Sequence, residues 1–107
     1  MSLVDFGGNK HVSEDAIMEA LDSAANVATL DLSNCGLGRR AGLVERIAQA
    51  LAKNRTVTRL RLGANGIHDL HAQKLAEALQ ANSTLTSLGL GNNCLTDKGA
   101  QHLAEAL

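Results

Sequence analysis

A repeated pattern of leucines constrains the fold of this chain more than any other feature of its sequence. Three segments share the spacing L-x-x-L-x-L-x-x-N/C-x-L, in which the leucine positions also accept Val or Ile. These segments are residues 27–37, 57–67 and 85–95. A fainter copy opens the chain around Val4. A repeat period of about 28 residues, as from Leu60 to Leu88, predicts a stacked repeat architecture rather than a single irregular core.

A second motif follows each of these segments and completes the repeat. Its copies are Ile17–Leu21, Ile47–Leu51, Leu75–Leu79 and Leu103–Leu107. An asparagine closely follows three of the copies, at Asn26, Asn54 and Asn82. The 107 residues therefore divide into four units, about 1–26, 27–56, 57–84 and 85–107, of which the first is degenerate. We expect these units to form one domain.

The two halves of each unit have different hydrophobic periods. The L-x-L half alternates with period 2, which predicts strands near 4–6, 28–33, 58–63 and 86–91. The second half has period 3.6, which predicts helices near 13–25, 42–53, 69–81 and 97–107. Ser13, Asp69 and Thr96 suit helix N-caps. The asparagines at 26, 54 and 82 suit a left-handed residue that ends a helix.

Stacking is necessary because one strand–helix unit cannot bury its own apolar side. Alanine is abundant, 17 residues beside 18 leucines, and its small side chain lets a helix lie close to the strands. We therefore expect an α/β solenoid, a right-handed β-α superhelix with four parallel strands on the concave side and helices on the convex side.

The motifs quoted above resemble the leucine-rich repeats of the ribonuclease-inhibitor type over nearly the whole chain. The resemblance extends to the repeats of NACHT-type receptors and of Ran GTPase-activating protein. It implies that the chain is a scaffold that binds another protein. The motif also implies that Cys35, Asn65 and Asn93 point inward and bond the backbone of the turns.

Side chains that flank the inward leucines should point out from the concave side. They form two predicted rows across the strands. One row contains Asp5, Asp31, Arg61 and Gly89, and the other places Arg59 between Thr29 and Ser87. We expect Asp31 and Arg61 to form an exposed ion pair. Asp31, Arg59, Arg61 and Ser87 are the candidate partner-binding residues, and a solvated sheet face without a partner is the alternative.

Composition excludes several other classes of function. Phe6 is the only aromatic residue, so no set of rings is available to stack on nucleic-acid bases. The net charge of −1 gives no general attraction to nucleic acid or to an anionic membrane. No run of about 18 apolar residues could form a membrane span. We find no secretory signal and expect a cytoplasmic protein.

Two groups of residues invite a chemical interpretation. His68, Asp69 and His71 have the spacing of metal ligands, but three ligands where a loop enters a helix are weak evidence, and we expect no metal. Cys35 and Cys94 should lie about two strand spacings apart, roughly 10 Å, which is too far for a disulfide. We expect both thiols to be free, and we expect no cofactor.

The sequence therefore predicts a protein that is not an enzyme and that forms part of a larger repeat protein. The alternative is a regulatory repeat protein of the GTPase-activating type, for which no catalytic residue can be named. The last unit ends on an apolar helix position and is expected to be uncapped. Either a longer chain or a homodimer through this C-terminal repeat would cover it.

Overall fold

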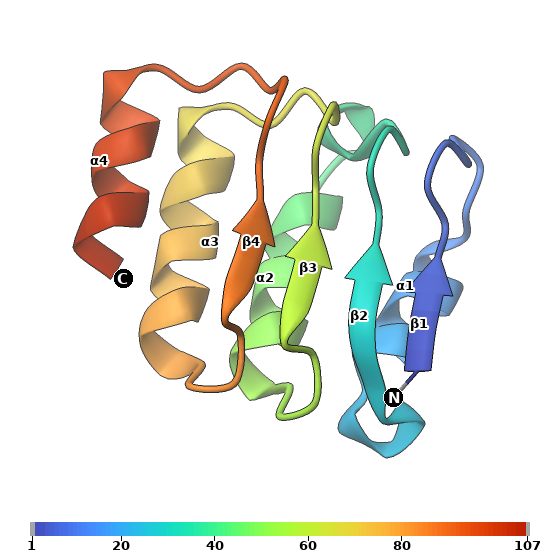
Figure 1. The fold of residues 1–107 in the computed structure, drawn as a ribbon. Helices are drawn as coiled ribbons and strands as arrows, with labels where there is room; N and C mark the ends of the chain where they lie inside the picture. Colours follow the sequence, from blue (N-terminus) through green and yellow to red (C-terminus); the bar gives the residue numbers. More distant parts are fainter. Residues whose placement is uncertain (1, 107) are drawn as a thin grey trace.

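The computed structural model describes residues 2–106 and shows strands and helices in alternation along the chain (Figure 1). The strands lie side by side in one layer, and the helices cover one face of that layer. The four strands are β1 (Ser2–Asp5), β2 (Val27–Asp31), β3 (Arg59–Arg61) and β4 (Ser87–Gly89). The four α-helices are α1 (Glu14–Leu21), α2 (Leu43–Lys53), α3 (Asp69–Ala81) and α4 (Asp97–Ala106). The 3-10 helices are η1 (Ser23–Ala25) and η2 (Leu37–Arg39).

All neighbouring strands are parallel, and they are ordered β1-β2-β3-β4 as in the sequence. The register places Leu30 opposite Leu60 and Leu60 opposite Leu88. The predicted alignment of the units is therefore confirmed. Consecutive parallel strands require a long crossover, which each helix supplies. The α/β solenoid predicted from the two periods is the observed fold.

The core lies between the strand layer and the helix layer. Leu30 and Leu60 are 0% exposed, and Ile47 on α2 and Leu75 on α3 belong to the same buried cluster with almost no exposure. Leu88 occupies the same position in the fourth unit but is only half-buried. Burial is therefore most complete in the second and third units, which have a neighbour on each side.

The later strands are shorter than predicted. Residues 58, 62–63, 86 and 90–91 fall outside β3 and β4, and the predicted residues 6 and 32–33 fall outside β1 and β2. The lateral ladder nevertheless continues beyond the strands, because Leu32 N donates to Arg61 O at 2.8 Å and Leu62 N donates to Gly89 O at 2.8 Å. The chain then bends at residues of positive φ, which are Gly8, Asn34, Ala64 and Asn92. The L-x-L period continues into stacked turns and therefore cannot mark where a strand ends.

The helix predicted over 13–25 is wrong as one continuous element. Asp22 is extended, with φ −72° and ψ 129°, and its carboxylate accepts a hydrogen bond from Ala24 N. Aspartate competes for backbone groups in this way and favours a cap over a helix interior. The prediction over 69–81 is confirmed, and α2 begins one residue later than expected. Leu107, the last residue of the helix predicted over 97–107, lies outside the described residues.

The inward residues after each strand bind the unit before them. Asn65 Oδ1 accepts hydrogen bonds from Cys35 N at 2.9 Å and from Leu37 N at 3.3 Å. Its Nδ2 donates to Leu32 O at 2.8 Å. Asn93 repeats this arrangement one unit later, accepting from Asn65 N at 2.9 Å. The predicted inward orientation is confirmed, and these amides join adjacent units.

Of the helix-ending asparagines, Asn26 has the predicted left-handed backbone, with φ 55°. The prediction is wrong for Asn54 and Asn82, whose backbones are extended. Asn54 Oδ1 accepts from Thr56 N and Val57 N, and its Nδ2 donates to Leu21 O at 2.7 Å. The side chain satisfies the backbone here, so a left-handed residue is unnecessary.

Two of the predicted N-caps are observed. Ser13 Oγ accepts from Ala16 N, and Thr96 Oγ1 accepts from Lys98 N. The third is wrong, because His68 is the N-cap of α3 and Asp69 is its first residue. The Asp69 carboxylate instead accepts hydrogen bonds from the Thr96 N–H and hydroxyl, which lowers the pKa of Asp69. Asp69 therefore joins α3 to the start of α4.

Candidate protein-binding face

The candidate residues come together on the concave side of the sheet. The register places Asp31 between Asp5 and Arg61, and Arg59 between Thr29 and Ser87. Both predicted rows are therefore present. On β3 the outward residues Arg59 and Arg61 are exposed, whereas Leu60 between them is buried. Alternation along the strand thus presents both arginines on the same face.

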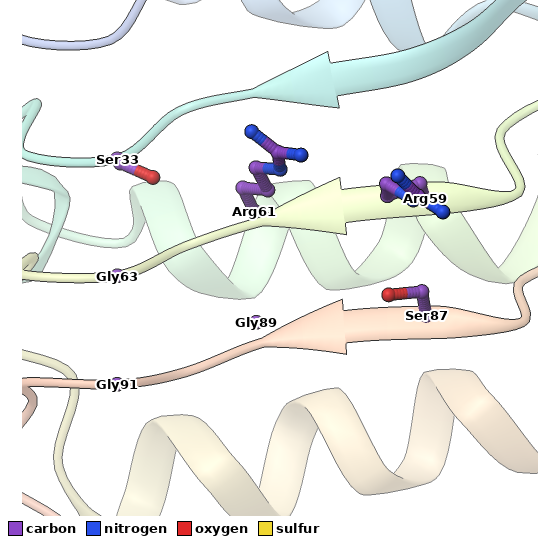
Figure 2. Close-up of a pocket in the computed structure, with 7 residues that line it drawn as sticks. All are labelled: Ser33, Arg59, Arg61, Gly63, Ser87, Gly89 and Gly91. Atoms are coloured by element: carbon purple, nitrogen blue, oxygen red, sulfur yellow. The ribbon is translucent and has the colours of Figure 1, made fainter.

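A shallow hollow of about 330 Å³ lies over β3 and β4 (Figure 2). The arginine side chains rise from β3, with the Ser33 and Ser87 hydroxyls on either side. Three residues leave the floor without side chains, namely Gly63, Gly89 and Gly91. A partner backbone could therefore approach the sheet closely here.

Arg61 and Asp31 form the predicted ion pair, with Nη1 and Oδ2 separated by 3.8 Å. The Arg61 side chain remains 53% exposed, and that of Asp31 is 18% exposed. Asp31 Oδ1 is already occupied, because it accepts a hydrogen bond from Ser33 N at 2.9 Å. A single long contact at an exposed site leaves most of the guanidinium donors of Arg61 available.

The Arg59 side chain has no hydrogen bond or ion pair with any residue that the structure describes. Its strand neighbours in register are Thr29 and Ser87, and neither is charged. An arginine carries five N–H donors and is always charged at neutral pH. The donors of its guanidinium are therefore not engaged by any described residue and are open to a partner.

A second hollow, of about 390 Å³, lies between β1 and α1 at the N-terminal end of the solenoid. Its lining is mainly apolar and includes Val4, Phe6 and Val27, with Glu19 at one side. These side chains belong to the layer that other units bury against a neighbour. The hollow is thus the open side of the first unit rather than a site with converging polar groups.

His68 and His71, two of the residues with metal-ligand spacing in the sequence, contact each other. The rings of His68 and His71 stack with centroids 3.7 Å apart, and His71 Nδ1 accepts a hydrogen bond from His68 N. Burial, followed by the nearby His68, lowers the pKa of His71, although Glu45 partly opposes this shift. Within residues 2–106 no group of three or more His, Cys, Asp or Glu side chains could hold a metal ion.

The cysteines have different surroundings. Cys35 is buried, its thiol lies 3.1 Å from Phe6 O, and burial raises its pKa. Cys94 is exposed, and both thiols are free. A buried thiol with a raised pKa is a poor nucleophile, so Cys35 has a structural role in the turn.

Ser33, Gly63, Gly89 and Gly91 also line the hollow, although none of them was among the candidate residues chosen from the sequence. They matter because the absence of side chains at the glycines shapes the hollow around the arginines. The repeat did contain a signal for Gly63 and Gly91, since three units carry glycine at that outward position, the other being Gly7. The glycines were not chosen, because they carry no side chain that could form a hydrogen bond or an ion pair.

Comparison with known proteins supports the repeat. The family model described as "Leucine Rich repeat" matches residues 53–76 and 81–104. These matches cover the second half of the chain, where the repeat is most regular. No curated protein sequence matches the chain.

Solved structures with the same fold are longer than this chain. The structure titled "Leiomodin-1 Actin-Binding Site 2 (ABS2)" is 26% identical, with a TM-score of 0.81 over 99% of this chain. The tropomodulin C-terminal domain of Caenorhabditis elegans is 15% identical, with a TM-score of 0.74 over 89% of this chain. The chain spans 63% of the first structure and 57% of the second.

These findings do not single out NACHT-type receptors or Ran GTPase-activating protein, and they give the GTPase-activating alternative no support. Among the described helices, none is long and apolar enough to cross a membrane. The stacked strand–helix units, the family-model matches and the structural relatives agree with one another. The chain is an α/β solenoid of leucine-rich repeats.

Proposed function

We propose that this chain is a non-catalytic protein-binding module and that its partner binds the concave face around β3 and β4. The proposed contact residues are Asp31, Arg59, Arg61 and Ser87. The observation that carries the proposal is the exposed Arg59 side chain on β3, which has no partner among the residues that the structure describes. Arginine is enriched at the energetic centres of protein interfaces.

The difference between the inward and outward positions of the strands supports this proposal. Inward positions carry Leu30, Leu60 and Leu88, whereas the outward positions in register with Arg61 carry Asp31 and Gly89. A structural requirement would repeat in each unit. Outward positions that differ from unit to unit are suited to specific recognition of one partner.

Actin is the first named partner to test. The leiomodin-1 structure carries "Actin-Binding Site" in its title and matches 99% of this chain. At 26% identity this relationship identifies a candidate, and the coarser proposal of protein binding does not depend on it. Co-sedimentation with filamentous actin tests this candidate directly.

A tryptophan placed on the concave floor tests the proposed face without disturbing the fold. A Cβ atom built at Gly89 would meet nothing closer than Arg61 Cα at 3.8 Å, which is ordinary contact. Gly89→Trp should therefore fold but obstruct the face. Gln73→Trp places the same side chain at an exposed position of α3 and is the matched control.

Affinity capture from the source cell, with quantitative mass spectrometry, compares these two variants with the wild type. We expect at least one protein to be lost with Gly89→Trp and retained with Gln73→Trp. The opposite pattern, with capture lost only for Gln73→Trp, would move the binding site to the helices. The proposal includes a cytoplasmic location, which imaging of the tagged protein in the same cells tests.

Self-association through the fourth unit stays a prediction. Its inward residues Leu88, Leu90 and Leu95 are only partly buried, so association would remove further apolar surface from water. Sedimentation equilibrium at micromolar concentration should show dimers. A strict monomer would contradict this part of the proposal and leave the concave face unaffected.

A further inference from the structure

The concave face carries opposite charges on its two halves. Asp5 and Asp31 lie next to each other in register on β1 and β2. Arg59 and Arg61 lie on β3, and the facing residues of β4 are Ser87 and Gly89. No acidic residue lines the hollow over β3 and β4. The face is therefore negative toward β1 and positive toward β4.

The positive half has unused binding capacity. Arg59 has no partner within the described residues, and Arg61 has only the 3.8 Å contact with Asp31. The Ser87 hydroxyl lies beside Arg59 in register. Guanidinium groups bind carboxylates through paired hydrogen bonds, which makes a carboxylate the best-matched ligand for these two groups.

The floor of this half is low enough for an extended segment. A Cβ atom at Gly91 would meet no atom within 4 Å, and at Gly63 it would meet only Gly91 O at 3.4 Å and the Ser33 hydroxyl at 3.9 Å. A segment that crosses the strands could thus lie close to the backbone. Two strand spacings, about 10 Å, correspond to roughly three residues of extended chain.

The negative half argues against a polyanion as the ligand. A nucleic acid or an anionic membrane long enough to pass over β1 would bring its charges close to Asp5 and Asp31. The negative charges of the ligand and of the two carboxylates would then repel each other. The described residues of this face also include no aromatic ring on which a base could stack.

We propose that the concave face recognises an extended protein segment that places acidic side chains over Arg59 and Arg61 and a basic side chain over Asp5 and Asp31. The inference rests on the proposed function, since it names the chemistry of the partner at the same face. The partner segment crosses the strands with one polarity, because its reversal would pair like charges on both halves.

A pair of synthetic peptides tests this polarity. The first carries glutamates at its N-terminal end and lysines at its C-terminal end, separated by three serines, and the second has every charge inverted in place by exchanging Glu and Lys. A segment can lie across the strands in either direction, so each peptide carries a spin label at one end. Its N-terminus is acetylated and its C-terminus is amidated, which removes the terminal charges. Paramagnetic broadening in the NMR spectrum then reports which end lies over β4.

We expect the glutamate end of both peptides to lie over Gly89 and Gly91. The signals of β4 should therefore broaden when the spin label is on the glutamate end, and those of β1 when it is on the lysine end. Arg59→Ala/Arg61→Ala should weaken binding by about 5-fold or more, the range of one or two exposed ion pairs. Lys53→Ala/Lys74→Ala removes the same charge from exposed positions of α2 and α3 and should leave binding unchanged.

A charge reversal guards against loss of binding through misfolding. Arg59→Glu should bind a peptide with only lysines more tightly than the wild type does, a gain that an unfolded variant cannot produce. Equal binding of the wild type to inorganic phosphate, to oligothymidylate and to the peptides would overturn the proposal in favour of a general anion site. Peptide binding that ignores the arginine substitutions would also overturn it.

The peptide result is separable from the proposed function. Suppose that Gly89→Trp loses its cellular partner whereas Arg59→Ala/Arg61→Ala retains it at wild-type affinity. The concave face would then bind protein, and the acidic-segment inference alone would be wrong. If Gly89→Trp retains all partners, the proposed function fails first.

Discussion

The two sides of the strand layer differ in how much their residues vary from unit to unit. On the inward side, Leu30 and Leu60 are fully buried, and Asn65 and Asn93 make the same hydrogen bonds one unit apart. On the concave side, the residues in register change from Asp31 to Arg61 to Gly89. The inward side is thus fixed by the need to stack. The concave side is free to vary, and this freedom is what a binding surface requires.

The largest loss of stability should follow truncation of the shared core. Leu60→Ala should lower the free energy of unfolding by about 2–5 kcal/mol, because Leu60 is fully enclosed between two neighbouring units. Leu88→Ala should cost less, because Leu88 is only partly buried. Urea denaturation followed by circular dichroism measures both. Equal losses of stability would contradict this expectation, because the half-buried Leu88 would then stabilise the fold as much as the fully buried Leu60.

Removal of an inter-unit amide should have the next largest effect. Asn65→Ala would leave Cys35 N and Leu37 N without their acceptor in a buried turn. Each buried unsatisfied group costs about 1–3 kcal/mol, and the lower part of that range for the two N–H groups gives a total of about 2–3 kcal/mol. Asn93→Ala, at a more exposed position, should cost less. The same denaturation experiment would contradict this account if Asn65→Ala were neutral.

The stability of the protein should depend on pH through His71, an inward residue that differs from those at the same place in other units. His71 is buried, whereas Leu43 and Gly99 stand at the equivalent places of units two and four. Because burial lowers the pKa of His71, the unfolded chain binds the proton more readily. Stability should therefore be complete above the unfolded value of 6.5 and fall as the pH drops through the folded pKa.

His71→Gln should remove that part of the pH dependence. The pKa of Asp69 is also lowered, but its contribution is lost only as the pH falls below the ordinary value of 3.8, so the two windows are distinct. Denaturation curves collected between these two values test His71 alone. An unchanged pH profile in His71→Gln would assign the acid sensitivity to another group.

A small gain in stability should come from the turn that follows β3. Ala64 has φ 56°, a conformation that the other units give to Gly8, Asn34 or Asn92. A left-handed alanine costs about 1–2 kcal/mol, so Ala64→Asn should raise the free energy of unfolding by about 0.5–1 kcal/mol. Thermal unfolding detects this change. Asn92→Ala should produce the opposite shift, and a loss in both variants would contradict the explanation.

The sequence predicted the repeat, the strand order and the concave rows because burial imposes the same spacing on each unit. It did not predict where each strand ends, since lateral hydrogen bonds such as Leu62 N to Gly89 O continue into the turns. It also misassigned Asn54 and Asp69. Their roles depend on groups about a unit away in the sequence, Leu21 O and Thr96, which only stacking brings near.

The candidate site was predictable in a similar way. Alternation placed Arg59 and Arg61 on the open face, and the ion pair with Asp31 followed from the register. The importance of Gly89 and Gly91 depends on the space above them, which residue type alone does not convey. The identity of the partner depends on a second molecule, so no pattern within this chain contains it.

Replacement of the concave residues of the third unit by those of the fourth tests the central claim most directly. Arg59→Ser/Arg61→Gly gives the third unit the outward residues of the fourth, Ser87 and Gly89, and leaves each inward residue in place. The account predicts a folded protein that loses about 1 kcal/mol of stability at most from the added glycine. Its affinity for the partner captured by the wild type should fall about tenfold or more. Unchanged affinity in the folded variant would contradict the claim that the residues which vary between units on this side, Arg59 and Arg61, carry the binding.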